Sequence, residues 1–262
     1  MNSQSISNPS DTIKPAVINV GDELMLGEKR NTNQEWMLRR LWELNHPALV
    51  SLSVGDDPAQ ISDWIRHLGY SGHGPILVSG GIGGTHDDRT REAIAIAFDL
   101  ELTRHSECFK ILSARYGDTF TSQRQRMAML PAGAELINNP HGAPGFCIGN
   151  VYAFPGFPNM LQPMMNEVLA RILPFDPTQW QTIEARLASP EGDIAMEIEE
   201  FGTAHPQWRI GIYPSTKNFR RETSVRIRYP ADSPQAVPVI ERFLTRLAGD
   251  LNVTLNFEMK RE

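Results

Sequence analysis

A glycine-rich segment, Gly80–Asp88, carries the residues best suited to chemistry. Four glycines occur in five positions, directly after a short apolar run and before an amphipathic stretch. Glycine lets the backbone turn tightly and approach a ligand closely. Successive N–H groups at the start of a helix bind anions, usually phosphate. We therefore predict a phosphate-binding loop, with a tight turn that holds no ligand as the alternative. Its predicted ligand-binding residues are Ser79, Gly80, Gly81, Gly83, Gly84 and Thr85.

Two carboxylates follow the glycines, Asp87 and Asp88. Carboxylates beside a bound phosphate are unfavourable unless a cation lies between them, so this pair predicts a divalent ion such as Mg, Mn or Co. One of the two is expected to cap the following helix, and the other is then the catalytic candidate. His86 is either a further ligand or base, or a solvated loop side chain.

Two more turns follow predicted strands. Asp22 and Glu23 come straight after the first strand. Loops after parallel strands open on the same edge of a sheet, so we expect Asp22 among the catalytic carboxylates and Glu23 among the metal ligands. The alternative is an acidic turn exposed to water. Gly156 lies in a third turn, between a strand and a helix that Pro158 can start, and is predicted to approach the ligand.

Two better-known phosphate loops do not fit this sequence. A G-x-G-x-x-G fingerprint beginning at Gly81 has His86 at its last glycine position, and it would follow the third strand rather than the first. The segment also lacks the lysine of a Walker A loop. A Rossmann or P-loop site is therefore not favoured.

The elements around these turns alternate between strand and helix. Strands are predicted at 16–20, 48–54 and 75–79, from short apolar runs. Helices are predicted from a capping box of Thr32 with Glu35, from Asp57-Pro58, and over 88–98. This βαβαβα order predicts a mostly parallel sheet with helices on both faces, an α/β/α sandwich.

Beyond residue 100 the pattern predicts a helix at 122–130, a hairpin of 146–148 with 151–154, and a helix at 158–173. The prolines of 174–177 indicate a linker. A second α+β domain follows, whose βαββαβ order is ferredoxin-like. The predicted organisation is a disordered N-terminus at 1–14, a first domain at 15–175 and a second at 178–262. The second domain's predicted strands are 180–187, 208–213, 223–229 and 252–257, and its helices 191–202 and 233–247.

Bulk composition excludes several classes. The 262 residues are 40% hydrophobic and 21% charged with a net charge of −6, which does not favour nucleic-acid or membrane-surface partners. The two cysteines, Cys108 and Cys147, lack zinc-site spacing. No apolar run approaches the roughly 20 residues of a membrane span, and the polar N-terminus lacks a signal core. A cytoplasmic protein is expected.

An alternating strand in the second domain places two arginines together. Arg226 and Arg228 interleave with Val225, Ile227 and Tyr229, so the arginines should lie on the open face of the sheet. A solvated basic surface is one interpretation, and docking on an acidic surface of the first domain or of a neighbouring subunit is another. Nucleic-acid binding is less favoured, because no aromatic residues interleave the arginines. The basic residues just before the strand are Lys217, Arg220 and Arg221.

Seven motifs of the first domain resemble, in order and spacing, the competence/damage-inducible protein CinA and the molybdopterin-binding-like domain of eukaryotic FAD synthases. Both are similar to the molybdenum-cofactor proteins MoaB and MogA. Two tail segments, 192–195 and 211–214, also resemble CinA relatives. The motifs are residues 21–24, 31–33, 80–88 with Thr90, 130–134, 139–140, 143–146 and 155–158.

The resemblance implies a molybdopterin-binding fold, homo-oligomers, and either pterin binding or metal-dependent hydrolysis of nucleotide diphosphates such as ADP-ribose or FAD. The leading hypothesis is the hydrolase. A non-catalytic pterin- or nucleotide-binding module is the alternative, and molybdopterin adenylylation a third. The loop departs from the family at Ser79, where threonine is common, and at Gly84, where proline is common. CinA's amidase domain has no counterpart in this sequence, so nicotinamide-mononucleotide deamidation is not expected.

Overall fold

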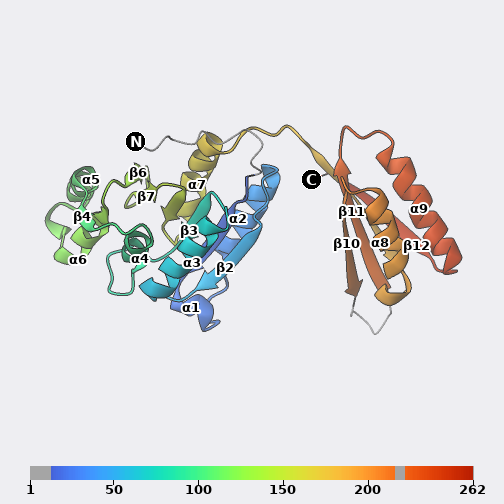
Figure 1. Ribbon diagram of the computed structural model, residues 1–262, viewed down its shortest axis with the longest axis horizontal. Coiled ribbons are helices and arrows are strands. Elements are labelled where there is room, and N and C mark those ends of the chain that lie inside the picture. Colours follow the sequence, from blue (N-terminus) through green and yellow to red (C-terminus); the bar gives the residue numbers. More distant parts are fainter. Residues whose placement is uncertain (1–12, 216–221, 262) are drawn as a thin grey trace. The chain divides into compact units, whose positions relative to one another are not determined.

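The computed structural model describes residues 13–215 and 222–261 and divides the chain into two compact units, Met1–Asp176 and Pro177–Glu262 (Figure 1). Most of the predicted disordered N-terminus, and the basic cluster Lys217, Arg220 and Arg221, lie outside the described residues. Lys14 is described, and it forms an isolated β-bridge with Gly74.

A six-stranded sheet forms the centre of the first unit, in the order β2-β1-β3-β8-β7-β6. The four strands from β2 to β8 are parallel, and the hairpin strands β7 and β6 are antiparallel to their neighbours. The sheet is therefore mostly parallel, and the predicted hairpin is confirmed. The bounds are β1 Ala16–Val20, β2 Val50–Val54, β3 Ile76–Ser79, β6 Glu135–Ile137, β7 Gly145–Ile148 and β8 Val151–Phe154.

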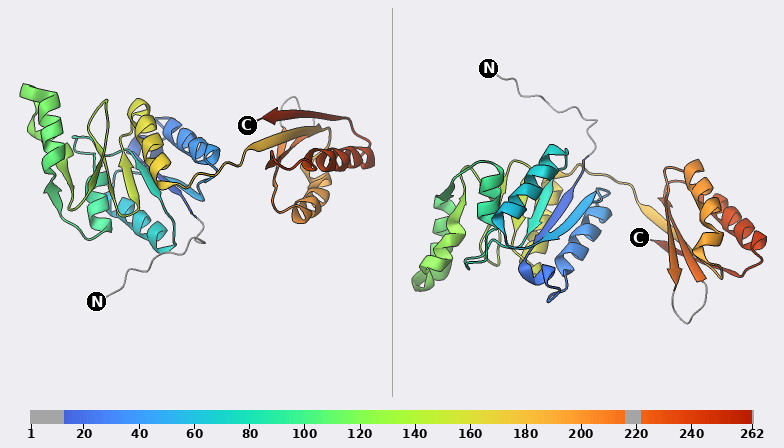
Figure 2. Two further views of the ribbon diagram at one scale, coloured as in Figure 1. Left: turned by 90° about the horizontal axis from the view of Figure 1, so that it is seen from above. Right: turned by 60° about the horizontal axis from the view of Figure 1, so that its bottom comes forward.

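Helices cover both faces of this sheet, as the two views of Figure 2 show. On one face, α3 (Pro58–Tyr70) and α4 (Thr90–Ala97) pack on Ile18 and Val78. On the other, α2 (Thr32–Glu43) and α7 (Pro158–Ile172) pack on Val17 and Leu77. Successive side chains of β1 point to opposite faces of the sheet, and all five residues are buried because helices cover both faces. The predicted α/β/α architecture is confirmed.

Helix starts decide how the loops approach the site. Asp57 caps α3 by accepting a hydrogen bond from Ala59 N at 3.1 Å, as predicted. The predicted capping box of α2 is wrong. Asn31 is the cap and accepts from Gln34 N at 3.0 Å, because an asparagine one residue earlier caps at least as well as a threonine.

The connection between α4 and the hairpin differs most from expectation. The predicted helix 122–130 breaks after one turn, α6 (Ser122–Gln125), and a 3-10 turn leads into strand β5 (Met129–Pro131). The residue before a proline disfavours helical geometry, which explains extended Leu130. Sequence patterns did not predict β4 (Leu102–Arg104), which pairs with β5, or α5 (Ser106–Tyr116).

The second unit has the predicted ferredoxin-like βαββαβ order, and its sheet runs β10-β11-β9-β12. Helices α8 and α9 pack on one face of this sheet. Each helix begins later than predicted, α8 after a 3-10 turn at Glu191–Asp193. The bounds are β9 Trp180–Leu187, α8 Ala195–Ala204, β10 Arg209–Ser215, β11 Glu222–Pro230, α9 Ala236–Asp250 and β12 Leu255–Arg261.

Strand β11 alternates as expected, with Val225 and Ile227 buried under the helices. Arg226 lies on the opposite face, but it is not merely solvated: its guanidinium is 3.1 Å from Glu184 Oε2 and 5.0 Å from the ring centre of Tyr213. One aromatic ring, that of Tyr213 on the neighbouring strand β10, therefore packs on Arg226, although no aromatic residue lies between the arginines in β11 itself.

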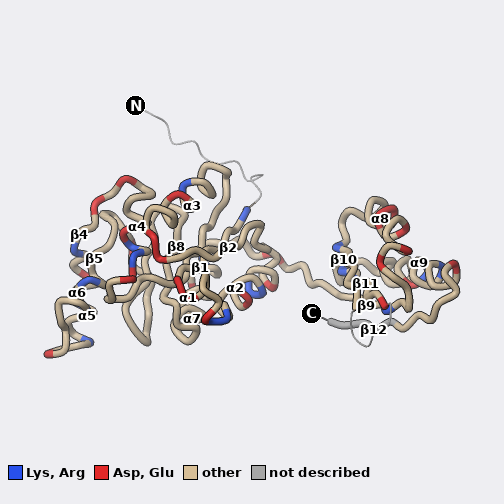
Figure 3. Tube along the Cα trace, turned by 90° about the horizontal axis from the view of Figure 1, so that it is seen from below, with Lys and Arg blue, Asp and Glu red and all other residues tan. Residues whose placement is uncertain are grey.

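Figure 3 shows the charge distribution of the second unit, with basic residues on β10 and acidic residues on α8. In neither unit does the described chain contain a helix long and apolar enough to cross a membrane.

Candidate functional site

A cavity of about 690 Å³ lies at the carboxyl edge of the parallel strands. Such an edge is where open α/β sheets bind ligands. The loops after β1, β2, β3 and β8 and the start of α2 form its walls, so the three predicted turns meet here. Of the predicted site residues, all but Asp22 line it. Those lining it are Glu23, Ser79, Gly80, Gly81, Gly83, Gly84, Thr85, Asp87, Asp88 and Gly156.

The glycine loop begins with two backbone conformations that suit only glycine. Gly80 has φ +103° and Gly81 φ +66°, and a Cβ on Gly81 would collide with the Thr90 hydroxyl. That hydroxyl donates to Gly80 O at 2.9 Å, and Gly81 O accepts from Thr90 N at 3.0 Å. The first turn of α4 thus fixes the entry of the loop.

The Asp88 carboxylate is bonded within the glycine loop rather than at the start of the helix. Its Oδ1 accepts from Gly83 N at 2.7 Å, and its Oδ2 accepts from Thr85 N at 2.8 Å and from the Thr85 hydroxyl. The predicted aspartate cap of this helix is therefore wrong: α4 begins at Thr90, after Arg89, with no side-chain cap. The Asp88 carboxylate therefore accepts hydrogen bonds from the N–H groups of Gly83 and Thr85 in the loop, and not from the first N–H groups of α4.

Arg91 is hydrogen-bonded to the backbone of the glycine loop. Its side chain is 6% exposed, and it donates to Ile82 O and, at 3.5 Å, to Asp88 O. Burial lowers the pKa of Arg91 to about 10, with the Asp88 charge opposing that shift. A cation held under the loop without a direct carboxylate partner favours an anion above it.

Part of the predicted phosphate cradle remains available. Gly80 N donates to Phe154 O at 3.0 Å, and Gly83 N to Asp88. Within the described chain, the N–H groups of Gly81, Ile82 and Gly84 have no hydrogen-bond acceptor. All three residues line the cavity, so these N–H groups are candidate donors to a phosphate.

Asp87 differs from Asp88 in that its side chain faces solvent. It is 61% exposed, and His86 Nδ1 lies 3.8 Å away on a side chain that is itself 94% exposed. The Thr85 hydroxyl and the backbone N–H of Asp87 hold the pKa of its carboxyl below the usual value. Asp87 is therefore ionised and accessible, as a metal ligand must be.

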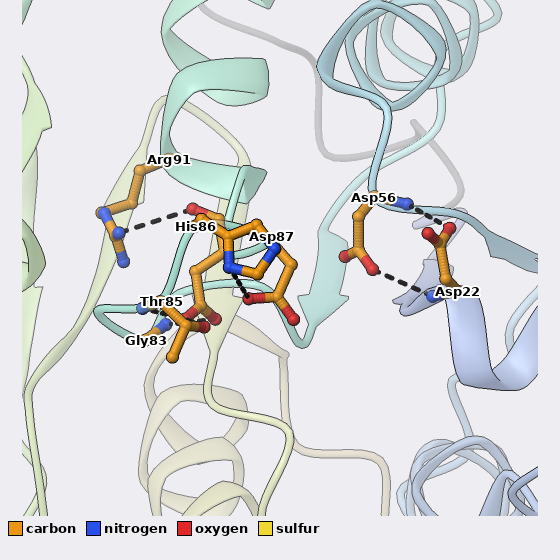
Figure 4. Close-up of polar contacts among 8 residues, drawn as sticks. Asp22, Asp56, Gly83, Thr85, His86, Asp87 and Arg91 are labelled. Carbon is orange, nitrogen blue, oxygen red and sulfur yellow. Dashed lines mark hydrogen bonds and ion pairs between the residues drawn. The ribbon is translucent and has the colours of Figure 1, made fainter.

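An acidic wall stands opposite, built by the loops after β1 and β2. Asp22 N donates to Asp56 Oδ2 at 2.9 Å, and Asp56 N donates to Asp22 Oδ1 at 3.0 Å, which locks the two loops together (Figure 4). Burial raises the pKa of Asp56, and the charges of Asp22, Glu23 and Asp87 raise it further against one backbone hydrogen bond. Glu23 also pairs with Lys29, at 3.4 Å.

Several carboxylates lie near one another on this wall, but they do not form a complete metal-binding site within the described residues. Across the described ranges, no three His, Cys, Asp or Glu side chains converge closely enough to hold a metal unaided. The donors are hard oxygens, which suit Mg²⁺ or Mn²⁺, and such ions commonly take one or two carboxylates together with substrate phosphates. Within the described residues, at most two of Glu23, Asp56 and Asp87 can therefore share one cation.

Asn33 joins the glycine loop to the turn after β8. Its Nδ2 donates to Gly156 O at 2.8 Å and to Ser79 Oγ at 3.2 Å. The predicted ligand residues Ser79 and Gly156 thus lie at the site, but Ser79 Oγ and Gly156 O already accept hydrogen bonds from Asn33. Gly156 also lies close to the loop, since a Cβ there would be 3.6 Å from Gly80 Cα.

Sequence reasoning missed three residues of the site, Asp56, Arg91 and Asn19. Asp56 follows β2, so the same edge argument that selected Asp22 would have found it. Arg91 is the second residue of α4, where an arginine ordinarily points to solvent, and no local pattern marks its burial. Asn19 is a polar residue inside an apolar strand, which was a usable signal.

Comparison with known proteins places these features in context. Residues 16–174 match the family described as probable molybdopterin binding domain. A CinA-like protein from Anaeromyxobacter sp. (strain Fw109-5) is 36% identical over 151 residues, 54% of this chain and 36% of that protein. A protein from Aeropyrum pernix is 28% identical over 258 residues, 90% of this chain and 95% of that one.

Among solved structures, CinA from Thermoplasma acidophilum, described as of unknown function, matches with a TM-score of 0.57 at 29% identity. The match covers 62% of this chain and 99% of that chain. The present chain spans little more than a third of the Anaeromyxobacter relative but nearly all of the one from Aeropyrum.

Proposed function

Since the chain belongs to the family of probable molybdopterin-binding domains, related to CinA, we propose that its cavity binds a nucleotide diphosphate and hydrolyses it with a divalent cation. The observation that carries this proposal is the pairing, in one cavity, of unused loop N–H donors with a crowded acidic wall. Donors alone indicate an anion site, and carboxylates alone a cation site. Together they suit a phosphate that arrives with a metal ion.

Phosphate binding falls to the glycine loop. The N–H groups of Gly81, Ile82 and Gly84 bind the phosphate oxygens, and the buried charge of Arg91 favours the anion from below. Asp88 keeps the loop in shape by holding Gly83 and Thr85. Because these donors are fixed before the ligand arrives, they stabilise charge that develops on the phosphate oxygens.

At most two of Glu23, Asp56 and Asp87 would hold the cation, together with the substrate phosphates, and the bound cation would supply charge neutralisation and a water of lowered pKa. Asp22 keeps Asp56 in place through the two reciprocal hydrogen bonds. Ionised Asp87 faces solvent, where it would be accessible to the cation. Asp22, predicted as catalytic, acts in this scheme as a positioning residue.

The test is to incubate the purified protein with ADP-ribose or FAD and Mg²⁺, Mn²⁺ or Co²⁺, and to measure AMP release. We expect AMP only with metal present, and at least a tenfold slower release from Asp87→Asn. Asp63→Asn is a matched control, since Asp63 lies in α3 and does not line the cavity. No AMP with any metal would reject the hydrolase.

One observation favours a second function, binding without turnover. The carboxylates do not form a complete metal cage, and the oxygens of Asp88 are engaged by the loop. In that case ADP-ribose or a pterin would bind with an affinity that metal changes little. Calorimetry with and without Mg²⁺ separates the two functions.

A further inference from the structure

Three residues form a polar row across neighbouring strands, and two of them, Asn19 and Ser79, line the cavity. In the register of the parallel strands, Asn19 of β1 lies between Ser53 of β2 and Ser79 of β3. Residues paired across neighbouring strands point to the same face, here the face covered by α2 and α7. Asn31 and Asn33, at the start of α2, reach down to this row and donate to Ser53 Oγ at 3.1 Å and to Ser79 Oγ at 3.2 Å.

Two amide groups of this cluster are incompletely bonded. Asn19 is 1% exposed; its Nδ2 has only the sulfur of Met37, at 3.9 Å, and its Oδ1 has no partner. Exchanging its amide nitrogen and oxygen would still leave a strong polar atom unpaired. Asn33 is fixed by its bonds to Gly156 O and Ser79 Oγ, and its Oδ1 is also buried and unpaired.

Unpaired buried acceptors are costly, about 1–3 kcal/mol each, and folded proteins rarely keep them without a reason. Both residues line the cavity next to the glycine loop. A phosphate cannot satisfy them, because it offers only acceptors at neutral pH. An exocyclic amino group can, because one nitrogen donates two N–H bonds, whereas a sugar hydroxyl donates one.

An aromatic surface lies beside this floor. Phe157 follows Gly156, lines the cavity and is 66% exposed, which is unusual for a phenylalanine. A flat ring can stack on such a side chain. The amide acceptors and the phenyl face thus both suit a heteroaromatic ring.

We propose that Asn19 and Asn33 read the amino-bearing edge of the ligand's ring, while the glycine loop holds its phosphate. The ligand class is a phosphorylated heterocycle with an exocyclic amino group, a purine or a pterin. This proposal rests on the proposed function only for the presence of a phosphorylated ligand in the cavity, and not for its hydrolysis.

The experiment compares ligands with and without the ring. Calorimetry is run with ADP-ribose and with ribose 5-phosphate against wild type and Asn19→Leu, which keeps the side-chain shape but removes the amide. We expect the variant to bind ADP-ribose about tenfold more weakly, as for one lost hydrogen bond, and ribose 5-phosphate unchanged. Its melting temperature should equal or exceed that of wild type, since a buried unpaired group is removed.

Asn19→Ala repeats the test should leucine fail to pack. Ser53→Ala is the matched control in the same row, because its hydroxyl already has a partner in Asn31. Ser53→Ala should not alter the ratio of the affinities for ADP-ribose and ribose 5-phosphate. 6-Hydroxymethylpterin in place of ADP-ribose separates pterin from purine recognition.

An equal loss of affinity for both ligands would overturn the proposal. A lower melting temperature with an unchanged affinity ratio would do the same, and would assign the amide to a buried water. The proposal would also be overturned if the wild-type protein bound ADP-ribose no more tightly than ribose 5-phosphate. Failure of the hydrolase proposal would give a different result: the protein would still bind ADP-ribose more tightly than ribose 5-phosphate but would release no AMP.

Discussion

Replacing Arg91 by methionine should weaken phosphate binding while leaving stability almost unchanged. The guanidinium is buried beneath the glycine loop and contacts two loop carbonyls, those of Ile82 and Asp88. Methionine keeps most of the length and packs in the same space but cannot donate. The loop would then lose its support from below.

Two opposing energies decide the stability of this variant. Burial lowers the pKa of Arg91 from its usual value to about 10, so the charge costs the folded state about 3 kcal/mol. Its hydrogen bonds to the two carbonyls return roughly 2–4 kcal/mol, the contact to Asp88 O at 3.5 Å being the weaker. These terms nearly cancel, so the melting temperature should move by less than about 5 °C.

Binding should respond more strongly, because the loop N–H donors must be held in place before the anion arrives. We expect calorimetry with pyrophosphate and Mg²⁺ to show at least about a tenfold loss for Arg91→Met. Arg91→Lys keeps the charge but lacks the forked guanidinium that donates to two carbonyls. Its affinity for pyrophosphate should lie between those of wild type and Arg91→Met. If Arg91→Met binds pyrophosphate as tightly as wild type, the loop does not depend on this side chain and the reasoning fails.

Four further changes test other parts of the molecule. Asp87→Asn should weaken Mn²⁺ binding in the presence of ADP-ribose by about tenfold without changing the melting temperature, as measured by electron paramagnetic resonance; an unaltered Mn²⁺ signal would remove Asp87 from the metal site. The raised pKa of Asp56 means that its ionised form costs stability above that pKa, so Asp56→Asn should melt higher than wild type at pH 7, with the gap closing as pH falls toward 3.8; a constant gap would contradict the assigned cause. Gly81→Ala forces a positive φ and a collision at the loop entry, and should lower the melting temperature by several degrees in calorimetry, whereas no change would show that the loop relaxes freely. Arg226→Met removes the arginine that lies 3.1 Å from the largely buried Glu184, and should destabilise the second unit by about 1–2 kcal/mol in urea unfolding; equal midpoints would make the pair irrelevant.

The layer architecture was predictable because each element carries its own signal. Apolar runs mark β1 and β3, and Asp57 with Pro58 marks the start of α3. The parallel order then follows from the alternation of strands and helices, and it brings the loops together at one edge. The region from 100 to 145 gave a weaker signal, and the helix predicted there at 122–130 breaks after one turn. Its short strands β4 and β5 are defined by pairing with each other rather than by local periodicity.

Within the site, sequence indicated which segments meet but not what each side chain does there. Asp87 and Asp88 are adjacent and chemically identical, yet one is exposed and the other is enclosed by the loop. The difference depends on where the N–H groups of Gly83 and Thr85 point, and that depends in turn on the positive φ of Gly81. A carboxylate held by three loop donors is poorly placed to give its oxygens to a metal as well.

That enclosure also determines what a loss of activity can mean. Removing the Asp88 carboxylate leaves two loop N–H groups and a threonine hydroxyl without their acceptor, so the loop itself should rearrange. An inactive Asp88→Ala variant would then look the same whether Asp88 binds the cation or only shapes the loop. Phosphate affinity without metal separates the two roles. It should fall for a residue that shapes the loop, and stay constant or rise for one that only binds a cation, because a negative charge beside the phosphate is removed. The geometry favours a fall, and an affinity that holds or rises would return Asp88 to the metal site.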